Sequence, residues 1–206
     1  MSLVFAAIAP HPPILLPNVG SEQDREKVKK TIENMDRLGS VLDEKKSTKI
    51  AISSPHPQWG FDVPLYFLAK NFKGEVEKLL LSIESPKHYF EKGRSFYKEE
   101  IGGSDSKFAF IASGDLSHCL KIGAPNGFHP DGPKFDEELI ECIKKKDVEK
   151  MFRLDEKYPE AAECGLRSIC FLFGVLEQKG KYTSKVLSYE EPFGVGYLVV
   201  NFEFHE

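Results

Sequence analysis

Three of the six histidines stand directly after short apolar runs of the chain. His11 lies in an APHP segment, His56 lies in an SPHP segment, and His118 closes the segment SGDLSH. The apolar runs that precede them are LVFAAIA at 3–9, KIAIS at 49–53 and FAFIAS at 108–113. Neutral imidazole is a common metal ligand and accepts a proton near neutral pH, so a cluster of these side chains would suit a metal centre or acid–base chemistry.

These histidines meet only if the runs before them are neighbouring strands of one sheet. The run at 3–9 is short and continuously apolar, and the runs at 49–53 and 108–113 are short and mostly apolar, which is typical of strands buried on both faces. In α/β sheets, ligands bind in the crevice at the carboxyl ends of the strands. A single loop histidine is commonly a surface group, and the prolines beside His11 and His56 also suit an ordinary tight connection. The repetition after three separate runs favours a shared site.

Two histidines alone do not complete a catalytic metal site. A carboxylate in the third position would form the facial triad of non-haem Fe(II) oxygenases. Among the 32 acidic residues, Glu163 is distinguished by its place near the start of the apolar segment 161–176. A glutamate in the first turn of a helix is also favoured by the helix dipole, so both roles stay open. His129, in the loop segment GFHP, is a further candidate for contacting a substrate.

The rest of the chain predicts helices and strands around these runs. Apolar residues recur at spacings of three and four over 22–45, behind a capping box of Ser21 and Asp24. Further helices are predicted at 86–100, 134–145, 147–155 and 160–178. Further strands are predicted at 61–68, 77–83, 185–189 and 194–204. The strand–helix–strand order predicts one α/β domain over 1–206, with a mostly parallel or mixed sheet flanked by helices on both faces.

Composition argues against several classes of function. The net charge of −4 disfavours a nucleic-acid partner, which normally requires a basic patch. No apolar stretch approaches the roughly 18 residues that span a bilayer, and no targeting signal is evident, so no membrane partner is expected. The four cysteines form no CxxC pair, which is typical of a protein from a reducing cytoplasm.

The order of the motifs resembles the LigB-type (class III) extradiol ring-cleavage dioxygenases. The motifs are APHPP at 9–13, SPHP at 54–57, FIASGDLSH at 110–118 and AAECGLRSICFLFGVLE at 161–177. Together with YEEPFGVGY at 189–197, they are most similar to the Memo-like branch, which includes proteins called AmmeMemoRadiSam system protein B. Each motif is short, so the resemblance rests on their shared order and spacing along nearly the whole chain.

The resemblance implies a role for each matching residue. His11 and His56 match the two iron-ligand histidines, and His118 matches the catalytic histidine that acts as acid and base. Glu163 matches the ligand glutamate of the dioxygenases. Memo-like proteins instead have a cysteine in a Cys-Gly pair, and Cys164 begins such a pair here. Glu163 and Cys164 therefore compete for the third position, and a thiolate would favour softer metals and weaken the case for ring cleavage.

The implied activity is the opening of a catechol-like aromatic ring by O₂ at Fe²⁺. Trp59 and other aromatic residues would line an apolar pocket for the ring, with His129 as a further substrate contact. Two alternatives stay open. One is a Memo-like metal-binding protein with a scaffold or redox role and no ring cleavage, and the other is a Zn²⁺-dependent hydrolase. Many members of the superfamily associate, so a homo-oligomer or a protein partner is compatible with the resemblance.

Overall fold

Six strands form one mixed sheet in the order β3-β2-β4-β1-β6-β5 in the computed structural model, which describes residues 3–205. The strands are β1 (Leu3–Ala9), β2 (Lys49–Ser54), β3 (Glu75–Leu80), β4 (Phe108–Ser113), β5 (Tyr182–Glu190) and β6 (Tyr197–Phe204). β3, β2, β4 and β1 pair in parallel, whereas β6 is antiparallel to both β1 and β5. This arrangement confirms the predicted α/β class with a mixed sheet.

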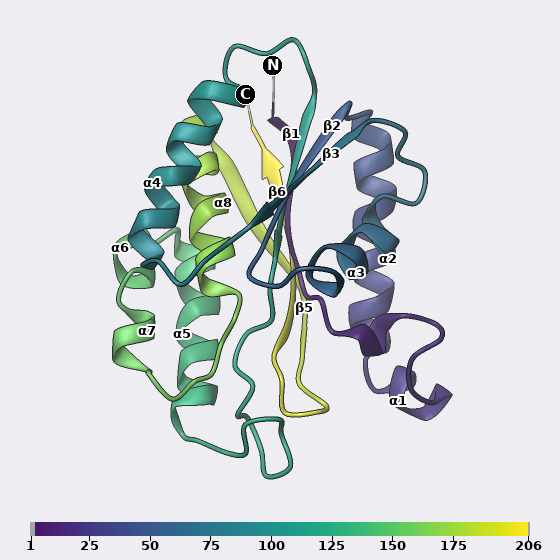
Figure 1. The fold of residues 1–206 in the computed structure, drawn as a ribbon, viewed down its shortest axis with the longest axis vertical. Coiled ribbons are helices and arrows are strands. Elements are labelled where there is room, and N and C mark those ends of the chain that lie inside the picture. The colour runs from purple at the N-terminus through teal and green to yellow at the C-terminus, as the bar shows by residue number, and fades with distance from the viewer. Residues whose placement is uncertain (1–2, 206) are drawn as a thin grey trace.

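Helices cover both faces of the sheet (Figure 1). The helices on one face are α4 (Pro86–Phe96), α5 (Asp131–Lys145), α6 (Val148–Met151), α7 (Leu154–Lys157) and α8 (Leu166–Lys179). The opposite face is covered by α2 (Lys29–Lys45) and α3 (Trp59–Leu68), with the short α1 (Glu22–Glu26) beside them. None of the described helices has the length and apolar character needed to cross a membrane.

The central strands β2, β4 and β1 are buried on both faces, as their mostly apolar runs predict. In β1, Leu3 and Ile8 belong to the apolar cluster under α8, whereas Phe5 and Ala7 belong to the cluster under α2. A strand packed on both faces requires apolar side chains at nearly every position. The order β2-β4-β1 makes the three strands direct neighbours, so their carboxyl ends lie side by side.

The strand predicted at 61–68 is wrong, because this segment is helix α3. A short apolar run does not by itself distinguish a buried helix from a buried strand. Phe61, Pro64 and Phe67 are all buried and recur at a spacing of three, which places them on one side of the helix. The helix packs this side onto the sheet and brings its first turn to the carboxyl end of β2.

Other element boundaries also differ from the prediction. The helix expected at 22–45 is broken at 27–28 into α1 and α2, although the predicted capping box of Ser21 and Asp24 is confirmed. The segment 147–155 contains the whole of α6 and the start of α7, and α4 continues into a π-helical turn at Tyr97–Ile101. The helix predicted from 160 begins only at Leu166. Residues 160–165 instead form a loop that runs along the carboxyl ends of the strands.

Candidate metal centre

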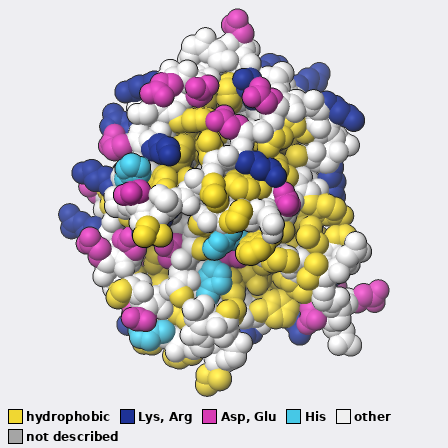
Figure 2. Space-filling model, viewed as in Figure 1, with side chains coloured by type: hydrophobic (Ala, Val, Ile, Leu, Met, Phe, Trp, Pro, Cys, Tyr) yellow, Lys and Arg dark blue, Asp and Glu magenta, His cyan; other side chains and the backbone are white. Residues whose placement is uncertain are grey.

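A pocket of about 420 Å³ opens at the carboxyl ends of β1, β4 and β2. Its lining includes the side chains of His11, His56, Asp115 and His118. The remaining lining residues are Pro12, Pro13, Trp59, Pro125, Val195 and Tyr197. Figure 2 shows histidine side chains near the centre of this face, bordered by hydrophobic surface. The structure therefore brings the three predicted histidines into one site.

His11 is buried and held by a chain of hydrogen bonds. Its Nδ1 atom lies 2.9 Å from Ser113 Oγ, and the Ser113 hydroxyl donates its single proton to the carbonyl of Gly60. Ser113 must therefore accept from Nδ1–H, which leaves His11 Nε2 as the acceptor that faces the Cys164 sulfur. Burial, followed by the proximity of His56 and His118, lowers the pKa of His11 to about 3. A neutral imidazole with an unprotonated Nε2 suits metal ligation.

The carbonyl that anchors Ser113 is available because α3 contains a proline. In an α-helix, the amide of residue 64 would donate to the carbonyl of residue 60. Pro64 has no amide hydrogen, so the carbonyl of Gly60 lacks its helical partner and accepts the Ser113 hydroxyl instead. A feature of α3 thus helps to orient His11, which follows a different strand.

His56 follows β2 and lies close to both His11 and Trp59. Its ring centroid is 5.3 Å from that of His11 and 6.0 Å from that of Trp59. The Ser54 hydroxyl holds the loop, because it accepts from the His56 amide at 3.1 Å and donates to the His56 carbonyl at 3.0 Å. Gln58, between His56 and Trp59, has a φ of 54°, which a non-glycine residue adopts only at a cost. The loop is thus held in one conformation.

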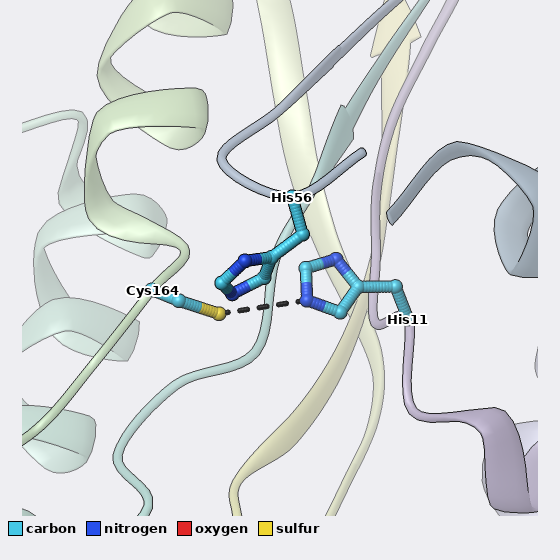
Figure 3. A group of neighbouring side chains, drawn as sticks. All are labelled: His11, His56 and Cys164. Atoms are coloured by element: carbon cyan, nitrogen blue, oxygen red, sulfur yellow. Dashed lines mark hydrogen bonds between the residues drawn. The ribbon is translucent and has the colours of Figure 1, made fainter. Parts of the chain in front are cut away.

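Cys164 supplies the third donor of this cluster. Its Sγ atom is 3.6 Å from His11 Nε2, and the donor atoms of His11, His56 and Cys164 all lie within 4.8 Å of one another (Figure 3). The amide of Asp115 donates to the same sulfur at 3.3 Å. Burial, with the nearby Asp115 carboxylate, raises the pKa of the Cys164 thiol well above its ordinary value. Only a bound cation would make the thiolate favourable here.

Glu163 lies beside this cluster, and its carboxylate has other partners. Its Oε2 atom accepts from the amide of Leu166 at 2.7 Å, and its Oε1 atom pairs with the Arg167 guanidinium at 3.2 Å. These contacts satisfy the first turn of α8 in the manner of a helix cap. Glu163 is not a member of the donor groups formed by the described residues, whereas Cys164 belongs to both.

Asp115 is a candidate functional residue to which the sequence interpretation assigned no role. Its Oδ1 atom accepts from the His11 amide at 3.0 Å, and its Oδ2 atom lies 3.8 Å from His11 Nε2. Burial raises the pKa of Asp115 to about 6, and this effect outweighs the hydrogen bond from the His11 amide and the proximity of His118 and His56. The signal was present in the loop SGDLSH, where this aspartate follows a buried strand in the same way as the histidines.

His118 and Asp115 form a second donor group with Cys164. The Nδ1 atom of His118 lies 2.7 Å from the carbonyl of Ala162. A carbonyl can only accept, so Nδ1 carries the proton and Nε2 is left as the acceptor that the pocket presents. Ala162 has a φ of 52°, and this strained backbone aims its carbonyl at His118.

The loops that carry Asp115 and Cys164 touch through two glycines. A Cβ atom on Gly114 would lie 2.3 Å from the Cα atom of Gly165, so neither loop could approach as closely with a larger residue. This contact sets the positions of the Asp115 amide and of the Cys164 sulfur that accepts its hydrogen.

The two predicted substrate contacts are placed differently. Trp59 lines the pocket and is 45% exposed, so its ring is accessible to a ligand. His129 is not among the lining residues, and its Nδ1 atom accepts from the amide of Asp131 at 3.2 Å. Val195 and Tyr197, from the start of β6, line the pocket instead and were not predicted.

The residues of the pocket fit a divalent transition metal. Imidazole, thiol and carboxyl groups converge, and this mixture of nitrogen, sulfur and oxygen donors suits iron or zinc better than magnesium or calcium. The buried Asp115 carboxylate has no lysine or arginine partner among the described residues, so a cation would remove an electrostatic penalty.

Fold and site together define an α/β protein with a candidate metal centre at the carboxyl edge of its sheet. The model of the family described as "Catalytic LigB subunit of aromatic ring-opening dioxygenase" matches residues 47–200. The chain belongs to this LigB family. The matched segment contains His56, His118 and Cys164, whereas His11 precedes it.

Two further comparisons concern proteins without a described activity. The chain is 38% identical over 172 residues to protein CA_C1420 of Clostridium acetobutylicum, covering 82% of this chain but only 36% of that protein. It therefore spans about a third of the length of that relative. The crystal structure of the uncharacterised protein JW3007 from Escherichia coli K12 superposes with a TM-score of 0.62. That alignment covers 96% of this chain and 99% of JW3007 at 14% identity, which shows a common fold.

Proposed function

We propose that the chain binds Fe²⁺ through His11, His56 and Cys164 and performs dioxygenase-type cleavage of a catechol-like ring. The observation that carries the proposal is the mutual approach of these three donor atoms, all within 4.8 Å. Ligands bound to one ion at about 2.0–2.3 Å are roughly 3–4 Å apart, so small side-chain movements would complete the site. Membership of a family of ring-opening dioxygenases supports the same reaction class.

We favour Cys164 over Glu163 as the third ligand. The Glu163 carboxylate caps α8 and pairs with Arg167, so ligation would require it to leave both partners. The Cys164 sulfur already faces His11 Nε2 at 3.6 Å (Figure 3). A cysteine at this position is also the feature that links the chain to the Memo-like branch.

When bound, the ion would supply Lewis acidity and the redox chemistry that O₂ requires. The other residues have roles that follow from their positions. His118 Nε2 is the available proton acceptor for a substrate hydroxyl, because Nδ1 is committed to Ala162. Trp59 provides an aromatic wall for the ring, and the buried Asp115 would balance the positive charge of the centre.

The experiment is reconstitution with Fe²⁺ under anaerobic conditions, followed by exposure to a catechol and O₂. We expect oxygen uptake together with the absorbance of a ring-opened product. The His118→Ala protein should keep its iron and lose turnover by about 10²-fold or more, as is typical when a general acid–base is removed. Loss of iron from His118→Ala, or full activity in it, would contradict the assigned role.

A second candidate is a metal-binding protein of the Memo-like type without ring cleavage. The specific observation that favours it is the cysteine in the donor cluster, where the dioxygenases have a carboxylate. A thiolate is a softer ligand and is itself oxidisable, which suits a redox role. Stoichiometric iron in the purified protein, with no oxygen uptake on any catechol, would select this candidate over the first.

A further inference from the structure

The lining of the pocket offers no cation to a ligand. Among the described residues that line it, none is lysine or arginine, and the only charged group is the carboxyl of Asp115. Proteins that bind a carboxylate commonly use the paired donors of an arginine. Nothing of that kind is available here, so an acidic ligand would lose its hydration without gaining an ion pair.

Three hydrogen-bond donors of the lining are already engaged. The Nδ1–H groups of His11 and His118 donate to Ser113 and Ala162, and the His11 amide donates to Asp115. The proposed ligation of His11 and His56 would occupy further imidazole nitrogens. A carboxylate in the pocket would therefore find uncharged donors such as the Tyr197 hydroxyl and the Trp59 indole N–H, but no lysine or arginine among the described lining residues.

The walls, in contrast, suit an apolar ring. Pro12, Pro13 and Val195 present aliphatic surface, and Trp59 presents a half-exposed indole. Pro125 lies at the exposed rim of the same pocket. Hydrophobic surface also borders the histidines on this face of the molecule (Figure 2).

We propose that the pocket selects a catechol carrying only hydrogen or small apolar substituents and rejects a catechol that carries a carboxylate. This inference rests on the proposed function and specifies its substrate class. The discrimination arises from the absence of lysine and arginine among the described lining residues, because a substituent carboxylate would lose its hydration in the pocket without gaining an ion pair with the protein.

The test compares two ligands of similar size, 4-methylcatechol and 3,4-dihydroxybenzoate. Their affinities are measured by calorimetry with the Zn²⁺-loaded protein, since zinc has no redox chemistry and the readout is binding. We expect 4-methylcatechol to bind about tenfold more tightly or better. Equal or tighter binding of 3,4-dihydroxybenzoate would overturn the selection and leave the proposed function standing. Binding of neither ligand would overturn the proposed aromatic substrate and this inference with it.

A matched pair of variants at the rim tests the electrostatic cause. Pro125→Arg adds a cation to the wall, and Pro125→Gln adds a neutral side chain at the same exposed position. We expect Pro125→Arg to bind 3,4-dihydroxybenzoate several-fold more tightly than Pro125→Gln, with 4-methylcatechol unchanged between the two. Equal binding of 3,4-dihydroxybenzoate by both variants would overturn charge as the reason for selection.

Discussion

Ser113 fixes the orientation of His11, because the Ser113 hydroxyl is 2.9 Å from His11 Nδ1 and donates its own proton to the carbonyl of Gly60. The imidazole therefore has one tautomer available, with Nε2 facing Cys164. This arrangement reproduces the way in which metal-bound histidines are held by a partner on their second nitrogen. Pro64 of α3 thus influences the orientation of the His11 imidazole, because it leaves the Gly60 carbonyl free to accept the Ser113 hydroxyl.

We predict that Ser113→Ala weakens metal binding by about 10–100-fold, the usual effect of removing such a partner. The measurement is a competition titration against a metal-binding dye. Ser53→Ala is the matched control, because Ser53 is equally buried at the neighbouring strand end but bonds to Ser168 instead of a histidine. Equal affinity in the Ser113→Ala protein and the control would show that the hydrogen bond does not orient His11.

The adjacent residues Glu163 and Cys164 should respond differently to removal. Cys164→Ala should lose bound metal and fold normally. Glu163→Ala should keep the metal and lower the free energy of unfolding by about 1 kcal/mol, because it removes a cap from α8. Metal content is measured by elemental analysis and stability by urea denaturation. Metal loss confined to Glu163→Ala would reverse the assignment of the third ligand.

The close contact between Gly114 and Gly165 predicts that a larger residue at position 114 lowers both stability and metal affinity. Gly114→Ala places a methyl group 2.3 Å from the Cα atom of Gly165, so the two loops must separate. We expect a loss of about 1–3 kcal/mol in stability, as for other overpacked sites, together with weaker metal binding as Cys164 moves away from His11. Gly103→Ala is the control, since a Cβ atom there meets nothing within 4 Å. A Gly114→Ala protein as stable as the control would contradict the close approach.

The ionisation of Asp136 predicts that the free energy of unfolding depends on pH, and this dependence can be measured on the metal-free protein. Burial raises its pKa to about 7, although Tyr189 and the Ser117 amide donate to the carboxylate. The unfolded chain ionises near the ordinary value of 3.8, so between pH 4 and 7 only the unfolded state releases this proton. The contribution of Asp136 to stability is therefore fully present below about pH 4 and is lost as the pH rises through about 7.

The measurement is the free energy of unfolding at pH 5 and pH 8 for the metal-free wild type and for Asp136→Asn. Asparagine keeps the size and can still accept from Ser117. We expect the loss of stability between the two pH values to be smaller in Asp136→Asn by a few kcal/mol, the order set by the shift in pKa. Parallel pH profiles for both proteins would show that Asp136 ionises normally in the folded state.

The sequence predicted the parts of the site that follow buried strands. The runs at 3–9, 49–53 and 108–113 are mostly apolar because they are covered on both faces, and each is followed at once by a proline-containing or polar loop, which favours a strand. The histidines after them were found for the same reason. The segment 61–68 was misread as a strand, because a short apolar run buries similar side chains in either conformation.

The sequence by itself determined that three histidines follow three short runs typical of buried strands, and its resemblance to the LigB-type dioxygenases made Glu163 and Cys164 the candidates for the third ligand. Only the tertiary structure decided that β2, β4 and β1 are adjacent and that the Cys164 sulfur faces the cluster while the Glu163 carboxylate caps α8. The reason is physical: strand order and the direction of a loop side chain depend on contacts between residues distant in the chain. Here those contacts include Gly114 against Gly165 and Ser113 against Gly60.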